Sequence, residues 1–452
     1  MISYDRGTPR CSHVREVLLR SPQSGAGRLS GQDALPMLLA GLDGRRVISP
    51  KRPSVDTAGL ADIFPYYAGF SFDFASAHIA AHSNRLNDSA VVLDPWNGSG
   101  TTTLAAQYLG HTAIGVDLNP AANTIAQLRC QIGDRARGVP VPKRRRSSPE
   151  SVAKDPLSRW LSPGVVARIR DWTCQLIESP AEQSYLGYVA IFRAVRGMTR
   201  KFEGSNPTWV KSSKSSEDLV ALSSDEVDAA IGVEEDFLLG RLQEFPVSAS
   251  RATMVTASSR ALPLKNGSVD VIVTSPPYLT RIDYGIAYSR ELAVLGIDTS
   301  VDRSLRSGLM GTTLIRGPIG SLGDALGGLA SGLIKDISGH SSKASGGYYL
   351  KQAVQYFSDL TAGLDEVTRV AKLGASMSLV VQDSYYKDIH VRLADICVEE
   401  AKMRGWEVVW SEQFKVTRSL TSLNKAAKEY VKGEVAESVL DFQLREKTAG
   451  HR

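Results

Sequence analysis

The sequence predicts an α/β protein with a doubly wound, Rossmann-like sheet and an inserted helical subdomain. The first observation is a strand, Gly-rich turn, helix and strand pattern between residues 90 and 117. The second is the return of alternating strands and helices after residue 250, following a long stretch with helical periodicity. Strands that alternate with helices form parallel βαβ units, so we expect both halves to share one sheet.

Changes in composition divide the chain. Residues 1–55 mix Ser, Gly, Arg and Pro, and we expect them to form a loosely ordered leader. Residues 56–138 and 250–452 carry the α/β pattern, whereas 139–249 begin with a Pro-, Ser- and Arg-rich stretch and continue as a helical insert with a predicted role in target recognition. Residues 298–347, rich in Gly, Ser and Leu, have weak periodicity and predict a mobile excursion over the site.

The apolar runs and their boundaries predict the elements of the α/β part. Strands are expected at 90–93, 112–116, 254–256, 269–273, 375–381, 406–410 and 437–442. Helices are expected at 72–81, 104–109, 349–370 and 393–404.

Composition sets limits on partners and compartment. The 452 residues are 42% hydrophobic and 22% charged, and the net charge of +5 permits a nucleic-acid partner without requiring one. The four cysteines have neither metal-ligand nor disulfide-framework spacing, and the histidines, among them His78, His82 and His390, form no cluster in the sequence. We therefore expect no metal, no membrane partner and a cytoplasmic protein.

The Gly-rich turn at 94–103 reads Asp-Pro-Trp-Asn-Gly-Ser-Gly-Thr-Thr-Thr. Gly98 and Gly100 allow the backbone to approach a ligand closely, and the helix N-terminus that follows suits an anion. Asp117 ends the next strand, where an acid can accept hydrogen bonds from two ribose hydroxyls. The dinucleotide and P-loop fingerprints are absent, so the pattern favours another nucleoside-type ligand, with a tight structural turn as the alternative.

A second motif follows the strand at 269–273 and reads Thr274-Ser275-Pro276-Pro277-Tyr278. Two consecutive prolines remove two backbone donors and fix two φ angles, so the carbonyls are held rigidly. The Ser275 hydroxyl, the Pro276 carbonyl and the Tyr278 ring suit a planar group with an exposed amine, such as a nucleobase edge. A strand-ending turn is the structural alternative.

Together, the segments DPWNGSGTT, GVDLNP and TSPPY resemble the S-adenosylmethionine-dependent amino methyltransferases of DNA, most closely the N4-cytosine enzymes and their N6-adenine relatives. The resemblance covers about residues 62–125 and 250–445. It implies that 56–138 and 250–452 form a methyltransferase domain that transfers a methyl group to an exocyclic base amine. A base inside a duplex must be flipped out to reach such a pocket.

The resemblance also implies residue roles. The loop at Asp94 to Gly100 lies under the methionine part of the cofactor, Asp117 binds the ribose and Leu118 flanks the adenine. Ser258 stands where the family usually has an acid that reaches the adenine amine. The implied cofactor-binding set is Phe70, Ser71, Asp94, Pro95, Asn97, Gly98, Gly100, Thr101, Asp117, Leu118, Ser258 and Thr274. The implied catalytic set is Ser275, Pro276, Pro277 and Tyr278.

Candidate DNA contacts lie in two regions. Arg281 and Tyr284 follow the catalytic turn. Arg193, Arg196 and Arg200 recur at helical spacing and predict one basic face for phosphates, with a solvated face as the alternative. The aromatic ring of Trp209 is expected either to stack on a base or to pin its loop to the core.

We therefore predict a DNA methyltransferase that acts on an exocyclic amine, with cytosine N4 favoured by Ser275, because a neutral acceptor suffices there. The alternatives are an N6-adenine enzyme, an RNA or protein-amide methyltransferase, and a non-catalytic component of a DNA-modification or defence complex. A restriction-modification context would add a partner nuclease or defence subunits, and the sequence leaves the oligomeric state open.

Overall fold

The computed structural model describes most of the chain after the predicted leader, whose first 48 residues lie outside the described part. The described residues are 49–51, 59–64, 69–84, 86, 89–131, 137–145, 152–204, 209–247, 252–279, 282–317, 326–342, 345–416 and 434–447. The chain divides into two compact units. One, here called the sheet unit, comprises Arg28–Cys130, Val247–Gly285 and Ser304–Arg452; the helical unit comprises Met1–Gly27, Gln131–Pro246 and Ile286–Arg303.

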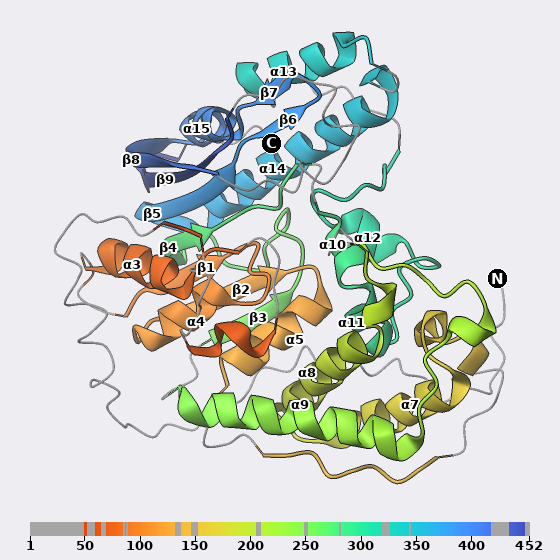
Figure 1. The fold of residues 1–452 in the computed structure, drawn as a ribbon. Coiled ribbons are helices and arrows are strands. Elements are labelled where there is room, and N and C mark those ends of the chain that lie inside the picture. The colour runs from red at the N-terminus through yellow and green to blue at the C-terminus, as the bar shows by residue number, and fades with distance from the viewer. Residues whose placement is uncertain are drawn as a thin grey trace, which may run out of the picture. The chain divides into compact units, whose positions relative to one another are not determined.

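A seven-stranded sheet forms the centre of the sheet unit (Figure 1). Its strands are β1 (Val91–Asp94), β2 (Thr112–Asp117), β3 (Ala252–Thr256), β4 (Val269–Thr274), β5 (Ala371–Gln382), β8 (Trp406–Lys415) and β9 (Ala436–Leu444). Their spatial order is β3-β2-β1-β4-β5-β9-β8, with β9 antiparallel to both neighbours and the other pairs parallel. A separate hairpin joins β6 (Ser384–Tyr386) to β7 (Ile389–Val391).

Helices cover both faces of this sheet. Outside the helices of the helical unit, the structure has α3 (Phe72–Ser83), α4 (Thr101–Tyr108), α5 (Pro120–Arg129), α12 (Ser304–Gly308), α13 (Gly328–Gly339), α14 (Leu350–Val370) and α15 (Leu393–Met403), with short helices at Gly59–Ile63, Tyr284–Ala287 (α10, which spans the boundary of the two units) and Ser345–Tyr349. Helix α4 connects β1 to β2 and α5 connects β2 to β3, so the chain moves toward one edge of the sheet. Helix α14 connects β4 to β5, so the chain moves toward the opposite edge. Right-handed crossovers therefore place α14 on the face opposite α4 and α5. The predicted doubly wound fold is confirmed.

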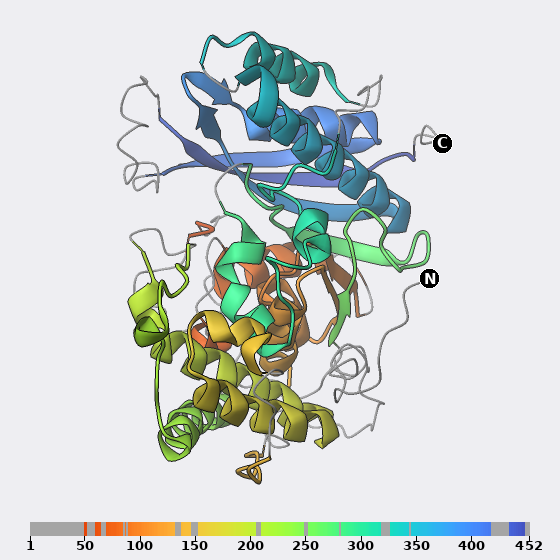
Figure 2. The same cartoon turned by 90° about the vertical axis from the view of Figure 1, so that its right-hand side faces the viewer.

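The larger apolar core lies on the α14 face. Leu364 and Val367 of α14 are fully buried with strand residues such as Leu93 and Ile272, and α13 and α15 complete this layer (Figure 2). The sequence predicts an irregular segment at 298–347, but α12 and α13 form within it. The stripe Ala330, Leu333, Ile334 and Ile337 of α13 is buried, and this tertiary contact outweighs the poor helix propensity of its glycines.

The helical unit contains α7 (Pro163–Glu178), α8 (Ala181–Met198), α9 (Ser224–Glu244) and α11 (Ser289–Val294), with short 3-10 turns at Pro156–Arg159, Arg200–Phe202 and Ser216–Asp218. A capping box between Ser223 and Glu226 starts α9. The unit also includes Ile286–Arg303, which the sequence assigns to the methyltransferase domain. Among the described helices of both units, none has the length and apolarity that a membrane span requires.

Two glycines in the left-handed region provide a matched test of this packing. Gly405 has φ +85°, and a Cβ there would lie 2.0 Å from the carbonyl oxygen of Glu446. Gly374 has φ +83° with open space around it. We expect Gly374→Ala to cost about 1–2 kcal/mol through backbone strain, and Gly405→Ala to cost about 1–3 kcal/mol more through the added clash. Urea unfolding measures both, and equal losses would contradict the packing.

Candidate functional site

The candidate site lies at the carboxyl edge of the sheet, between β1 and β4. These strands are parallel neighbours, with Val92 opposite Val271 and Leu93 opposite Ile272. The chain leaves β1 toward β2 but leaves β4 toward β5, so the strand order reverses here. Open α/β sheets bind ligands outside the carboxyl ends of strands at such a reversal. Asp94 ends β1 and Thr274 ends β4, so both sequence motifs begin at this point.

A buried carboxylate joins the two motifs directly. The Thr274 hydroxyl donates to Asp94 Oδ1 at 2.6 Å, and the Thr102 hydroxyl donates to Asp94 Oδ2 at 2.7 Å. The Trp96 amide also donates to Oδ1, at 3.1 Å. Burial raises the pKa of Asp94 to about 6, and the two hydroxyl bonds limit that rise. The Gly-rich loop and the proline motif are therefore held together, although 180 residues separate Asp94 from Thr274.

The loop after β1 needs its glycines. Gly98 has φ +50° and Gly100 has φ +86°, and a Cβ on Gly100 would lie 2.7 Å from the Cβ of Ala126. The Asn97 amide donates to the Val116 carbonyl at 3.1 Å, and the Asn97 side chain fills the space where a Cβ on Gly115 would lie. The loop thus lies tightly across the end of β2.

Asp117, at the end of β2, completes this loop. Its Oδ2 accepts from the Gly98 amide at 2.9 Å and its Oδ1 from the Asn119 amide at 2.8 Å. Burial raises the pKa of Asp117 to about 6, and these two bonds limit the rise. Each carboxylate oxygen keeps acceptor capacity beyond one hydrogen bond, so ribose hydroxyls can still be accepted. A Cβ on Gly308 would lie 2.7 Å from Leu118 Cδ2, so the end of α12 packs closely against Leu118, the residue after Asp117.

A buried arginine that sequence reasoning missed braces the same loop. Arg129 Nη1 donates to the Ser99 carbonyl at 3.0 Å and to the Ser99 hydroxyl at 2.7 Å, and Nη2 donates to the Phe64 carbonyl at 3.2 Å. Arg129 is 1% exposed. Its only sequence signal is a lone charged residue at the end of an otherwise uncharged helix, which is equally typical of a solvated C-terminus.

The proline motif is held from the α14 side. The buried Tyr356 hydroxyl donates to the Pro277 carbonyl at 2.9 Å. Gly311 has φ +74°, and a Cβ there would lie 2.9 Å from the Tyr278 carbonyl oxygen. Pro276 is buried and Ser275 is half-buried, and the Ser275 hydroxyl oxygen has two lone pairs that can accept hydrogen bonds. The motif therefore has a fixed backbone with an acceptor still available.

The position that departs from the family pattern has its own charged surroundings. The Ser258 hydroxyl accepts from the Arg260 amide and from Arg260 Nε, each at 3.3 Å. Arg260 pairs with Asp359 at 2.9 Å, and Arg316 pairs with the other oxygen of Asp359 at 2.5 Å. Arg260 also donates to the Gly308 carbonyl at 3.2 Å, beside Leu118. An acid is thus present near Ser258, but it comes from α14 and two guanidinium groups already neutralise it.

The remaining predicted cofactor residues occupy structural positions. The Ser71 hydroxyl accepts from the Phe74 amide at 3.1 Å and caps α3, and the Phe70 ring lies 5.3 Å from that of Phe74. Pro95 is buried in the turn, and Thr101 is the first residue of α4.

The structure corrects the basic face predicted on α8. Arg196 is buried and pairs with the fully buried Glu291 at 2.5 Å, because a charged group inside the unit needs a partner. Arg193 pairs with Glu234 at 2.5 Å and lies over the Phe237 ring. Arg200 is exposed, which fits a surface role.

The other predicted DNA contacts have mixed outcomes. Trp209 is 54% exposed, so its ring does not pin the loop to the core. Tyr284 is half-buried at the start of α10. Arg281 lies outside the described residues.

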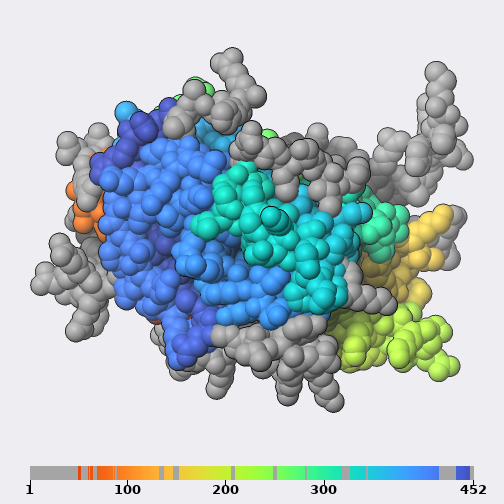
Figure 3. All heavy atoms as spheres, turned by 90° about the horizontal axis from the view of Figure 1, so that it is seen from above, coloured from red at the N-terminus to blue at the C-terminus, as the bar shows by residue number. Residues whose placement is uncertain are grey.

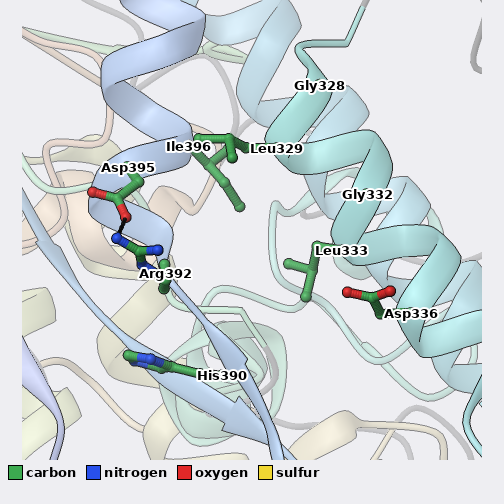
Figure 4. Close-up of a pocket in the computed structure, with 9 residues that line it drawn as sticks. All are labelled: Gly328, Leu329, Gly332, Leu333, Asp336, His390, Arg392, Asp395 and Ile396. Atoms are coloured by element: carbon green, nitrogen blue, oxygen red, sulfur yellow. Dashed lines mark ion pairs between the residues drawn. The ribbon is translucent and has the colours of Figure 1, made fainter.

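A separate pocket of about 240 Å³ lies in the sheet unit between α13, α15 and β7 (Figure 4). It is lined by Gly328, Leu329, Gly332, Leu333, Asp336, His390, Arg392, Asp395 and Ile396. Arg392 and Asp395 pair at 2.5 Å on its rim. Figure 3 shows the teal segment that contains α13 beside the blue segment that contains α15. The pocket includes no residue of the carboxyl edge, so we assign it no part in the candidate site.

The carboxyl-edge residues fit S-adenosylmethionine. A backbone loop without side-chain obstruction at Gly98 and Gly100 can lie under a methionyl chain, and Asp117 retains acceptor capacity for ribose hydroxyls. Two buried carboxylates with raised pKa values favour a ligand that carries positive charge.

Comparisons with known proteins agree with this class of site. Residues 49–128 match the DNA methylase family model of the N6 and N4 type, a stretch that contains Asp94–Thr103 and Asp117 and ends before Thr274. The match confirms the resemblance to amino-type DNA methyltransferases, and the cofactor that it indicates is S-adenosylmethionine.

One curated relative and two solved structures are also similar. The chain is 24% identical over 284 residues to the Type II methyltransferase M.BsoBI of Geobacillus stearothermophilus, and the match spans 55% of each chain, about half the length of that relative. The rRNA methyltransferase aviRa of Streptomyces viridochromogenes has 11% identity and a TM-score of 0.29, with 87% of this chain and 94% of that chain covered. A putative sarcosine dimethylglycine methyltransferase of Galdieria sulphuraria has 10% identity and a TM-score of 0.29, with 83% and 86% covered.

The buried ion pair of the helical unit can be tested by stability. Arg196→Met leaves Glu291 charged and buried, so we expect a loss of about 3–5 kcal/mol in the free energy of unfolding. Arg200→Met, on the exposed neighbouring position, should change stability by less than about 0.5 kcal/mol. The double variant Arg196→Met/Glu291→Met should recover part of the loss. Equal stabilities for both single variants would contradict the structural role of Arg196.

Proposed function

We propose that this protein is an S-adenosylmethionine-dependent DNA methyltransferase that acts on an exocyclic base amine. The observation that carries the proposal is the hydrogen bond from Thr274 to Asp94, which holds the start of the proline motif beside the Gly-rich loop. The proline motif, which offers hydrogen-bond acceptors for an amine, and the Gly-rich loop therefore lie at the same edge of the sheet. Catalysis in such a site consists of positioning and electrostatics, without a covalent enzyme intermediate.

The residues of the proline motif divide the work. The Ser275 hydroxyl and the Pro276 carbonyl accept the two hydrogens of the amine, which directs the nitrogen lone pair away from the ring. Tyr278 stacks on the base and fixes its plane. The Tyr356 hydroxyl supports Pro277 from behind, so the acceptor positions do not shift when the base enters. When bound, S-adenosylmethionine supplies a methyl group on a sulfonium leaving group.

The proposed cofactor residues act on the other side of the reacting atoms. Asp117 accepts ribose hydroxyls, while Asp94 fixes the loop geometry and contributes negative charge near a cationic ligand. Leu118 packs against the adenine, and Ser258 contacts its edge together with the Arg260 and Asp359 pair. Arg129 keeps the loop from opening.

Within this class we favour cytosine N4 as the acceptor. Ser275 provides a neutral acceptor at the position where adenine enzymes more often carry Asp or Asn. The substrate is proposed to be a flipped base in DNA, since an amine in a stacked duplex does not reach such an edge. Arg200 and Trp209 remain the candidate contacts of the helical unit, because both are exposed.

Methyl transfer can be measured directly. Protein incubated with S-adenosylmethionine and mixed-sequence duplex DNA should produce N4-methylcytosine, detected by nucleoside mass spectrometry. We expect Ser275→Ala and Tyr278→Ala to lower turnover by about 100-fold or more, since each removes an interaction with the reacting base. Cofactor affinity, measured by calorimetry, should change by less than about threefold in both, because neither residue belongs to the cofactor loop.

Specific outcomes separate the alternatives. If the product is N6-methyladenine, the acceptor base is adenine rather than cytosine, and the proposed transfer to an exocyclic amine still holds. Methylated RNA without methylated DNA would overturn the substrate, and unchanged turnover in Tyr278→Ala would overturn the stacking role. Tyr348→Ala, at an exposed tyrosine on the short helix at Ser345–Tyr349, is a matched control and should retain full turnover.

Cofactor affinity should depend on pH through the two buried carboxylates. Their pKa values are raised from 3.8 to about 6 by burial, so the cofactor-free fold retains these protons between about pH 4 and 6. A cationic ligand binds best to the ionised carboxylates, so affinity should fall as the pH drops below about 6, by up to about tenfold per pH unit for each group.

Calorimetry at about pH 7.5, 6 and 5 measures this dependence. Asp117→Asn should bind the cofactor more weakly at about pH 7.5 and show a shallower decline, because one of the two titrating groups is gone. An affinity that stays constant across this range in the unaltered protein would contradict a role for both carboxylates.

A further inference from the structure

A cluster of metal-ligating side chains lies on the α3 face of the sheet, outside the carboxyl-edge site. His78 and His82 are one turn apart on α3 and so lie on the same side of that helix. They face Ser378 of β5 and Asp441 of β9, which are direct cross-strand neighbours. No local pattern groups these residues, because β9 follows α3 by more than 350 positions. The expectation that the histidines form no cluster is corrected.

The distances within this cluster match those of a metal site. Asp441 Oδ1 lies 3.3 Å from His78 Nδ1 and 3.6 Å from His82 Nε2, and the three atoms lie within 4.8 Å of one another. Donor atoms at about 2.1 Å from a tetrahedral metal are separated by about 3.4 Å, close to both carboxylate–imidazole distances. The three side chains are 8%, 12% and 13% exposed, which leaves an entry path but little water.

Ser378 occupies the centre of the cluster. Its hydroxyl donates to Asp441 Oδ1 at 2.5 Å and lies 2.9 Å from His78 Nδ1 and 2.8 Å from His82 Nε2. A hydroxyl has one hydrogen and two lone pairs, so both imidazole nitrogens must donate to it in this arrangement. Three protons thus join four donor atoms, and a divalent cation can take the place of those protons once the Ser378 hydroxyl moves outward to the donor spacing of a metal site.

We propose that His78, His82 and Asp441 bind a divalent first-row transition metal of the zinc type, with the Ser378 hydroxyl as the fourth donor. Two imidazoles and one carboxylate favour such metals over Mg²⁺ and Ca²⁺, which prefer all-oxygen sites. Within the described residues this is the one group of three such side chains close enough to share an ion.

The metal would fasten α3 to two strands of the sheet. The Ser71 hydroxyl caps the start of α3, and the metal ligands lie on the second and third turns of the same helix. Binding therefore fixes the position of Phe70 and Ser71, the segment that precedes the helix. The role is structural, and it holds whether or not the protein transfers methyl groups.

The site can be tested with zinc alone on the full chain. Protein treated with a chelator and shown by circular dichroism to be folded is titrated with ZnCl₂ in a calorimeter. We expect one zinc ion per chain and a higher midpoint of thermal unfolding. Cobalt, used as a spectroscopic probe, should give the intense visible bands of a four-coordinate site. His82→Ala should weaken zinc binding by about 100-fold or more, since loss of a ligand exceeds the 10–100-fold effect of an outer-shell partner.

His340→Ala is the matched control. His340 Nε2 lies 2.8 Å from Asp388 Oδ1, and His340 Nδ1 lies 2.8 Å from the Ser342 hydroxyl. This group therefore contains the same residue types as the proposed metal site, a histidine, an aspartate and a serine, but only one imidazole. This variant should bind zinc as the unaltered protein does. If His82→Ala fails to fold, Asp441→Asn keeps the shape and the acceptor for Ser378 while removing the charged ligand, and it should also lose binding. Absence of zinc binding by the folded unaltered chain, or equal affinity in the His82 and His340 variants, would overturn the proposal.

Discussion

The hydrogen bonds that converge on Asp94 are the interaction on which the candidate site depends. One carboxylate accepts from Thr102 at the start of α4 and from Thr274 at the end of β4, so a loop and a strand end are fixed by the same buried group. An ionised carboxylate in this position is costly, and the raised pKa of Asp94 reflects that cost. Such a group is retained where it maintains a geometry that apolar packing cannot specify.

The sheet topology explains why this geometry arises at one edge. Parallel strands β1 and β4 end side by side, and their helices leave in opposite directions, so a ligand can lie above both without meeting either crossover. Asp117 at the end of β2 and the Pro277 carbonyl held by Tyr356 then extend the same edge in both directions. Each functional group is therefore attached to a rigid strand end, and the glycines at 98 and 100 provide the space between them.

Charged residues away from this edge have mainly structural partners. In the helical unit Arg168 is shared by Asp171 and Asp228, and Arg196 is paired with Glu291. In the sheet unit His78 and His82 share Asp441 through Ser378, and these contacts hold the pKa of that carboxyl well below its usual range. Cations paired in this way are not available to a nucleic-acid partner. A basic residue at helical spacing indicates a DNA face only when the opposing helix offers no acid.

The sequence by itself determined the βαβ unit, the doubly wound class and the two motifs, because these depend on local signals: apolar runs, positive-φ glycines and the proline pair. It did not indicate α13, whose glycines hide a buried stripe, or Arg129, whose role depends on Ser99 and Phe64. Only the tertiary structure decided that Thr274 meets Asp94, that Arg196 is buried and that α3 brings two histidines to β9. Contacts of this kind join residues far apart in the chain, and no local pattern encodes which strand edge or helix face will meet another.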